Sequence, residues 1–146
     1  MADLTLYQGF LSRNVPDWFA GSVVDCVPGC GLPYTGRAAV ILTPERLVIV
    51  SEEGRTLLTV YYESVIRVRE VEFRGLVIER NGALVAPNET FGTEIVYNSG
   101  YKFEAAVRVL NKSANNARTL VDNLNLAVKT YLEDLARGGG LIRRDE

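Results

Sequence analysis

The chain has no histidine and only two cysteines, Cys26 and Cys30, among its 146 residues. The absence of histidine excludes histidine-based acid–base catalysis and every common metal site that contains an imidazole. Two cysteines also fall short of the four ligands of a structural zinc ion. The sequence contains no G-x-S-x-G and no phosphate-binding glycine loop. We therefore expect neither a metal nor a cofactor, and no catalytic residues.

Basic charge and long apolar runs are scarce as well. The formal net charge is −2, and only Lys102, Lys112 and Lys129 are lysines. Proteins that bind nucleic acid normally carry a basic surface, so we do not expect a nucleic-acid partner. No apolar run approaches the roughly 20 residues that span a bilayer, and Asp3 stands where a signal peptide would carry positive charge. These features predict a cytoplasmic protein, one that could still lie at the membrane periphery.

The clearest element in the sequence is a helix over 113–137. Its apolar residues recur at steps of three and four, which places them on one side of a helix. They are Ala117, Leu120, Val121, Leu124, Val128, Tyr131, Leu132 and Leu135. Ser113 is a good N-cap, because its hydroxyl can accept a hydrogen bond from a first-turn N–H. A helix with one apolar side needs an apolar surface to pack on.

The residues before this helix carry strand and turn signals at short intervals. Apolar and β-branched runs occupy 21–26, 38–43, 46–51, 56–62, 64–73, 76–80, 93–99 and 101–112, with a weaker strand at 3–12 and an ambiguous stretch at 83–91. Within 64–73 the apolar residues do not keep one alternation. A β-bulge near Arg69–Glu70 would place Ile66, Val68, Val71 and Phe73 on one face. We therefore predict a bulge at that point.

Together these signals predict a mainly β fold, with about seven antiparallel strands in a barrel or sandwich and one long C-terminal helix as its cap. We expect a single domain over residues 1–137, followed by a flexible tail, 138–146, that begins at three consecutive glycines. Trp18 and Phe19 are predicted to plug one end of the barrel. The alternative for this aromatic pair is an exposed anchor for a membrane or a partner.

The segment Gly36-Arg37-Ala38-Ala39-Val40-Ile41-Leu42-Thr43-Pro44-Glu45-Arg46-Leu47-Val48-Ile49-Val50 contains the pattern LTxxRL between two strands. This pattern resembles the hairpin of GRAM and GLUE domains, two branches of the pleckstrin-homology-like (PH-like) superfold, and the resemblance covers about residues 21–137. It implies a non-enzymatic adaptor in membrane trafficking. In GLUE domains it implies ubiquitin and membrane recognition within the ESCRT-II sorting complex, and in GRAM domains lipid or protein binding. The expected partner is thus a protein such as ubiquitin, with peripheral membrane lipid second.

Two features of the sequence are candidate binding sites. Arg67, Arg69 and Arg74, joined by Arg80 and Lys102, could gather on one outer sheet face and bind an anion. The alternative is ordinary mixing of these charges with neighbouring glutamates. Leu126 lies off the apolar side of the helix and would be exposed, where it could contact a partner.

Other interpretations of the chain remain open. The fold could instead be a helix-grip or lipocalin-like barrel whose cavity carries a small hydrophobic ligand, or an enzyme that uses Glu and Arg residues in such a cavity. Cys26 and Cys30 are most simply two buried thiols, and a disulfide across the intervening Pro28-Gly29 turn is the alternative.

Overall fold

The computed structural model describes residues 22–80, 82–86, 90–100 and 103–137. The weaker strand predicted at 3–12, the Trp18–Phe19 pair and the tail 138–146 lie outside these residues. The described elements are β1 (Ser22–Cys26), β2 (Gly36–Leu42), β3 (Arg46–Ser51), β4 (Thr56–Tyr61), η1 (Tyr62–Ser64), β5 (Val65–Glu72), β6 (Ile78–Arg80), β7 (Ala83–Val85), β8 (Phe91–Asn98), β9 (Glu104–Leu110) and α2 (Ala114–Ala136).

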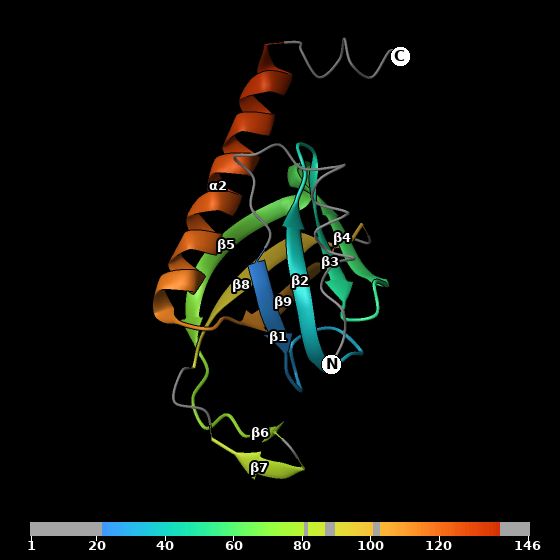
Figure 1. The fold of residues 1–146 in the computed structure, drawn as a ribbon. Coiled ribbons are helices and arrows are strands. Elements are labelled where there is room, and N and C mark those ends of the chain that lie inside the picture. The colour runs from blue at the N-terminus through green and yellow to red at the C-terminus, as the bar shows by residue number, and fades with distance from the viewer. Residues whose placement is uncertain (1–21, 81, 87–89, 101–102, 138–146) are drawn as a thin grey trace.

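Seven of the strands form one antiparallel sheet in the order β4-β3-β2-β1-β9-β8-β5. The predicted mainly β fold with a C-terminal helical cap is therefore confirmed, although the sheet is not closed: β4 and β5 are its two edges. The short strands β6 and β7 pair only with each other and form a separate hairpin, which projects away from the main sheet (Figure 1).

The sheet curls because the chain passes directly from one edge strand to the other. Only the 3₁₀ turn η1 connects Tyr61, at the end of β4, to Val65, at the start of β5. Four residue steps can span at most about 14 Å. The two edges must therefore approach each other at this corner, and the inner face of the sheet becomes concave.

The helix α2 covers this concave side and starts as predicted. The Ser113 hydroxyl accepts a hydrogen bond from the Asn116 N–H at 3.1 Å, so Ser113 is the N-cap. The main contacts of α2 are with β5, β8 and η1. One predicted inward residue was wrong: Leu132 is exposed, whereas Ala127 is buried. In the described part of the chain no helix has the length and apolarity needed to cross a membrane.

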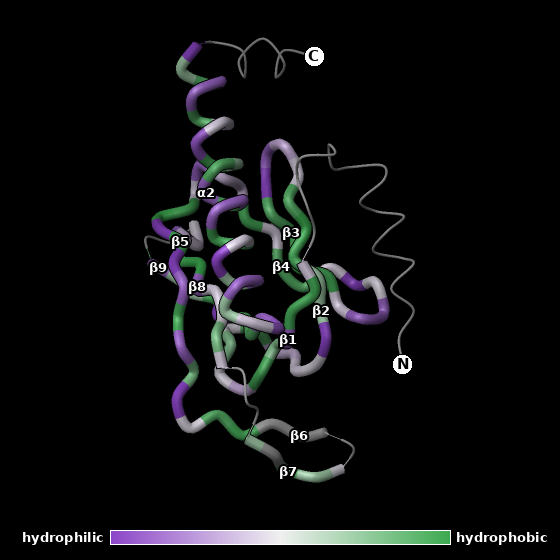
Figure 2. Tube along the Cα trace, turned by 60° about the vertical axis from the view of Figure 1, so that its left-hand side comes forward, coloured by the Kyte–Doolittle hydropathy of each residue, from purple (hydrophilic) through white to green (hydrophobic). Residues whose placement is uncertain are grey.

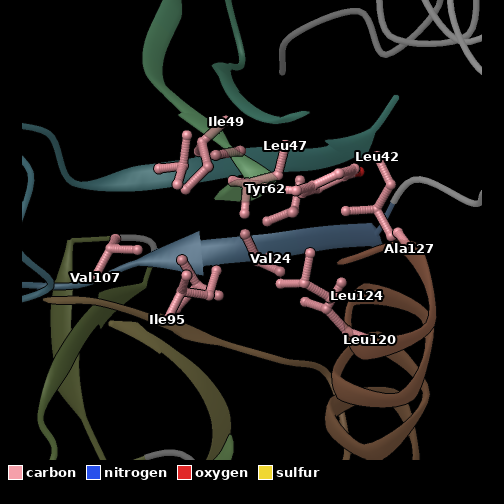
Figure 3. Close-up of a cluster of buried hydrophobic side chains, with 14 of the residues drawn as sticks. Val24, Leu42, Leu47, Ile49, Tyr62, Ile95, Val107, Leu120, Leu124 and Ala127 are labelled. Carbon is pink, nitrogen blue, oxygen red and sulfur yellow. The ribbon is translucent and has the colours of Figure 1, made fainter. Parts of the chain in front are cut away.

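The core lies between the inner face of the sheet and α2 (Figure 3). Its central side chain is Tyr62 of η1, which is fully buried and donates its hydroxyl hydrogen bond to the Thr43 carbonyl. The Tyr62 ring meets the Tyr131 ring edge-on, with centroids 6.0 Å apart. Tyr131 in turn donates to the Glu63 carboxylate at 3.1 Å. These contacts attach the helix to the corner where the sheet edges meet.

The hairpin between β2 and β3 is closed by Thr43. Its N–H donates to the Arg46 carbonyl at 2.9 Å, its hydroxyl donates to the same carbonyl at 2.8 Å, and the Arg46 N–H donates back to the hydroxyl at 3.1 Å. The Arg46 guanidinium lies 5.7 Å from the centre of the Tyr61 ring on β4, a cation–π distance. Thr43 therefore fixes the turn between β2 and β3.

The predicted β-bulge near Arg69–Glu70 was wrong. From Arg67 to Glu72 the register between β5 and β8 is regular, and the irregularity falls between Val65 and Arg67. Ile66 is exposed, and Val65 and Val68 are the β5 residues that pack on the core. With this regular alternation Val71 lies on the outer face with Arg69, whereas the predicted bulge had placed it on the same face as Val68.

Candidate interaction surface on the outer sheet face

The outer face of the sheet carries a row of three charged residues across β5, β8 and β9. Arg69 pairs with Glu94 in the β5–β8 register, and Glu94 pairs with Arg108 in the β8–β9 register. Directly paired residues on neighbouring strands project to the same face. We call Arg69, Glu94 and Arg108 the charged row.

The two arginines hold the carboxylate from both sides. Arg69 Nε lies 2.6 Å from Glu94 Oε1, and Arg108 Nε lies 2.7 Å from Glu94 Oε2. The Glu94 side chain is only 3% exposed, whereas those of Arg69 and Arg108 are 56% and 51% exposed. A guanidinium has five N–H donors. Since the bond to Glu94 uses the single Nε donor of each arginine, the donors of the terminal nitrogens are left for other acceptors.

These contacts shift the protonation equilibria in the expected directions. The hydrogen bond from Arg69 is the main cause that lowers the pKa of Glu94, and Arg108 adds to it, while burial opposes both. The hydrogen bond to Glu94 raises the pKa of Arg69. Both shifts favour the charged forms of Glu94 and Arg69, so they strengthen the ion pair between them.

The structure places the predicted arginines in different surroundings. Arg67 is exposed two residues before Arg69 and projects to the same outer face of β5. Arg74 is exposed in the turn after β5, beyond the sheet. Arg80 belongs to β6 of the separate hairpin, and Lys102 lies outside the described residues. The predicted cluster is therefore reduced to Arg67 and Arg69.

Leu126 is half-exposed on α2, which agrees with its position off the apolar side of the helix. It does not belong to the same surface as the arginines. The β5 residues that meet the helix side are Val68, which packs on the core, and Glu70, whose carboxylate lies 3.9 Å from Arg118 of α2. Arg67 and Arg69 alternate with these residues and point away from the helix, so Leu126 and the arginines lie on opposite sides of the sheet.

Sequence reasoning missed Glu94 and Arg108, the other two residues of the charged row. A polar residue at an alternating position of a strand is usually solvated, so neither residue stood out. The available signal was the combination of a glutamate in the apolar strand sequence TEIVY with an arginine in AAVRVL. A charged residue within an otherwise apolar strand is easily buried with its neighbours, and buried charges are almost always paired. One such residue in each of two strands therefore indicates a possible ion pair between them.

Cys26 and Cys30 are free, buried thiols, which confirms the simplest of their interpretations. Burial, with Cys30 and Asp25 nearby, raises the pKa of Cys26 to about 12. Because the thiolate is the reactive form, such a thiol is a poor nucleophile at neutral pH.

Comparison of the chain with protein-family models and with curated proteins finds no match.

Proposed function

We propose that the protein is a non-enzymatic interaction module that binds an acidic segment of a partner protein on the outer face of β5, β8 and β9. The observation that carries this proposal is the charged row, in which two half-exposed arginines are held in place by a buried glutamate. Arginine suits this role, because its planar guanidinium can bind a carboxylate through two parallel hydrogen bonds.

The fixed geometry of the arginines supports binding rather than simple solubility. A free arginine side chain loses considerable conformational freedom when it is immobilised by a ligand. Here the bonds to Glu94 already restrain both side chains, so a partner would lose less entropy on binding. Arg67 adds a further positive charge next to the row, and Glu104 adds a negative one on the outer face of β9, so three arginines and two glutamates give this face a charge of +1 in a chain whose net charge is −2.

The resemblance to GRAM and GLUE domains suggests which partner to test first. Ubiquitin or another protein of the ESCRT sorting machinery is the candidate, and an adaptor in membrane trafficking is the corresponding cellular role. Leu126, on the opposite side of the sheet, is a separate candidate contact for a second partner. An anionic membrane is the competing ligand for the arginines, and we rank it second because the chain as a whole is acidic.

A ligand carrier is less well supported by the interior. Large, fully buried side chains from β3, η1, β8 and α2 meet at the centre of the core, among them Ile49, Tyr62, Ile95 and Leu124 (Figure 3). A carrier would need this central space for its ligand.

The test is an NMR titration of the isotope-labelled full chain with ubiquitin and, separately, with vesicles that contain anionic lipid. The proposal expects ubiquitin to shift the amide resonances of β5, β8 and β9. The double variant Arg69→Gln/Arg108→Gln should lose most of the affinity, whereas Arg118→Gln on α2, which removes one exposed arginine elsewhere, should retain it.

Two results would count against the proposal. Shifts with vesicles alone would reassign the arginines to lipid. No shift with either ligand would remove both candidates and, with them, the proposed function.

A further inference from the structure

The β2–β3 hairpin has a second apolar face, on the side of the sheet opposite the core. Residues alternate between the two faces of a strand. Ala38, Val40, Leu42, Leu47 and Ile49 belong to the core cluster on the inner face. The residues between them, Ala39, Ile41, Val48 and Val50, therefore project outward, and all four are apolar. We call these four residues the outer apolar patch.

The register makes this patch continuous. Ala39 pairs with Val50, and Ile41 pairs with Val48, so the four side chains form two adjacent pairs. Both strands of the hairpin are coloured mainly as hydrophobic in Figure 2, on either side of a hydrophilic turn. A strand that is hydrophobic at successive positions is typical of a sheet covered on both faces.

The outer apolar patch is also buried. Ile41 is fully buried, and the other three residues are at most 6% exposed. The helix does not account for this burial, because the main contacts of α2 are with β5, β8 and η1, on the inner side. A covering element on the outer side is required by the chemistry of the patch.

We propose that this covering element is the chain's own N-terminal segment, residues 1–21, and that the outer apolar patch is its docking surface. The connection favours this occupant, because Ser22, the first residue of β1, pairs with Val40, the neighbour of Ile41 in sequence. Ser22, to which the segment is covalently attached, therefore lies beside the patch. A segment of 21 residues can reach at most about 70 Å, far more than the length of the hairpin.

The composition of the segment matches the patch. It contains four aromatic residues, Tyr7, Phe10, Trp18 and Phe19, together with Leu4, Leu6 and Leu11. These side chains can bury large apolar areas. Covalent attachment also gives the segment a high effective concentration at the patch, on the order of millimolar for a short tether, which disfavours a second copy of the chain as the occupant.

This inference concerns the half of the outer face away from the charged row, and it does not depend on the proposed function. It assigns to residues 1–21 a role in completing the fold, rather than a role in contacting a membrane or a partner.

The experiment is nuclear Overhauser spectroscopy on the full-length chain, in a sample that mixes isotope-labelled and unlabelled molecules. The proposal expects contacts between the aromatic protons of residues 1–21 and the methyl groups of Ile41, Val48 and Val50 within one molecule. Trp18 is the sole tryptophan, so any contact from its indole ring can be assigned without ambiguity. Contacts only between labelled and unlabelled molecules would show that a second copy covers the patch and would overturn the proposal.

A variant provides an independent measurement. Replacing Tyr7, Phe10, Trp18 and Phe19 by leucine keeps the segment apolar but removes its ring currents. The methyl resonances of Ile41, Val48 and Val50 should then shift, while those of Leu47 and Ile49 on the inner face should stay nearly unchanged. Equal shifts on both faces, or none on either, would contradict docking of this segment on the outer apolar patch.

Discussion

The two halves of the outer sheet face differ in chemistry although they share one backbone framework. On β2 and β3 the outer apolar patch consists of small or branched apolar side chains, all buried, and the charged outward residues Arg37 and Arg46 lie at the ends of the strands. On β5, β8 and β9 they include the charged row, in which the glutamate is buried and both arginines reach solvent. The outer apolar patch itself contributes only to stability, because none of its four side chains has a polar group to direct a ligand. The charged half exposes hydrogen-bond donors, which makes it the half suited to recognition.

The comparison also separates two ways of burying an outward residue. Ile41 is buried by transfer of apolar surface out of water, which is favourable in itself. Glu94 is buried at a desolvation cost that its two arginine bonds must offset. The first kind of burial tolerates no polar substitution, and the second tolerates no loss of a partner.

The largest effect is expected from Ile41→Ala in the apolar half. The substitution removes buried methyl groups and leaves a cavity, which typically lowers the free energy of unfolding by about 2–5 kcal/mol. The matched control is Ile66→Ala on β5, since Ile66 is 45% exposed and should lose much less. Urea unfolding of both variants measures the difference. Equal losses would mean that the outer apolar patch is not truly covered.

Glu94→Gln should have the next largest effect, because it removes the charge that both arginines bond. We expect the free energy of unfolding to fall by about 1–3 kcal/mol, the usual loss when a buried hydrogen-bonded charge is removed. Glu104→Gln, at an exposed position on β9, is the control and should change stability by less than about 0.5 kcal/mol. If the two variants are equally stable, the charged row contributes nothing to the fold.

The dependence of stability on pH should be smaller and specific to the charged half. The pKa of Glu94 is lowered in the folded protein from an ordinary value of 4.5, so the unfolded chain binds its proton first as the pH falls. The contribution of Glu94 is therefore complete above pH 4.5 and is lost as the pH falls through its lowered pKa.

This prediction is measured by thermal unfolding between pH 7 and pH 3 for the wild type and Glu94→Gln. The stability curves of the two proteins should converge on the acid side, because glutamine resembles the protonated carboxyl group. Parallel curves over this range would show that the arginine bonds do not shift the Glu94 equilibrium.

Leu126→Asp should have the smallest effect on stability. Leu126 is half-exposed on α2 and lies on neither half of the outer sheet face, so the melting temperature should stay within the error of calorimetry. Binding of any partner that uses the helix should be abolished. A large drop in melting temperature would instead place Leu126 in the core.

Much of the fold could be predicted because its signals are local. The 3.6-residue spacing of Leu120, Leu124 and Tyr131 predicts the helix, and Ser113 marks its N-cap. The Thr43–Arg46 turn predicts the β2–β3 hairpin. The bulge was misplaced because the alternation on an edge strand is weak, so the sequence around Ile66 does not say which residue leaves the regular register.

The candidate site was harder to predict, because its residues come from three strands. Arg69 was predicted as a site residue, but its partners Glu94 and Arg108 are 25 and 39 positions further along the chain. No pattern within β5 indicates that β8, rather than β4, lies beside it.

By itself, the sequence determined the classes of element: a capped amphipathic helix and a series of short strands, two of them apolar at successive positions. Periodicity and turn chemistry act over a few residues, so they can be read without knowing the neighbours. Only the tertiary structure decided that η1 brings the two edges of the sheet together and that Glu94 lies between two arginines. Strand order depends on how the whole chain closes around its core, and charges from separate strands interact only after that order is set.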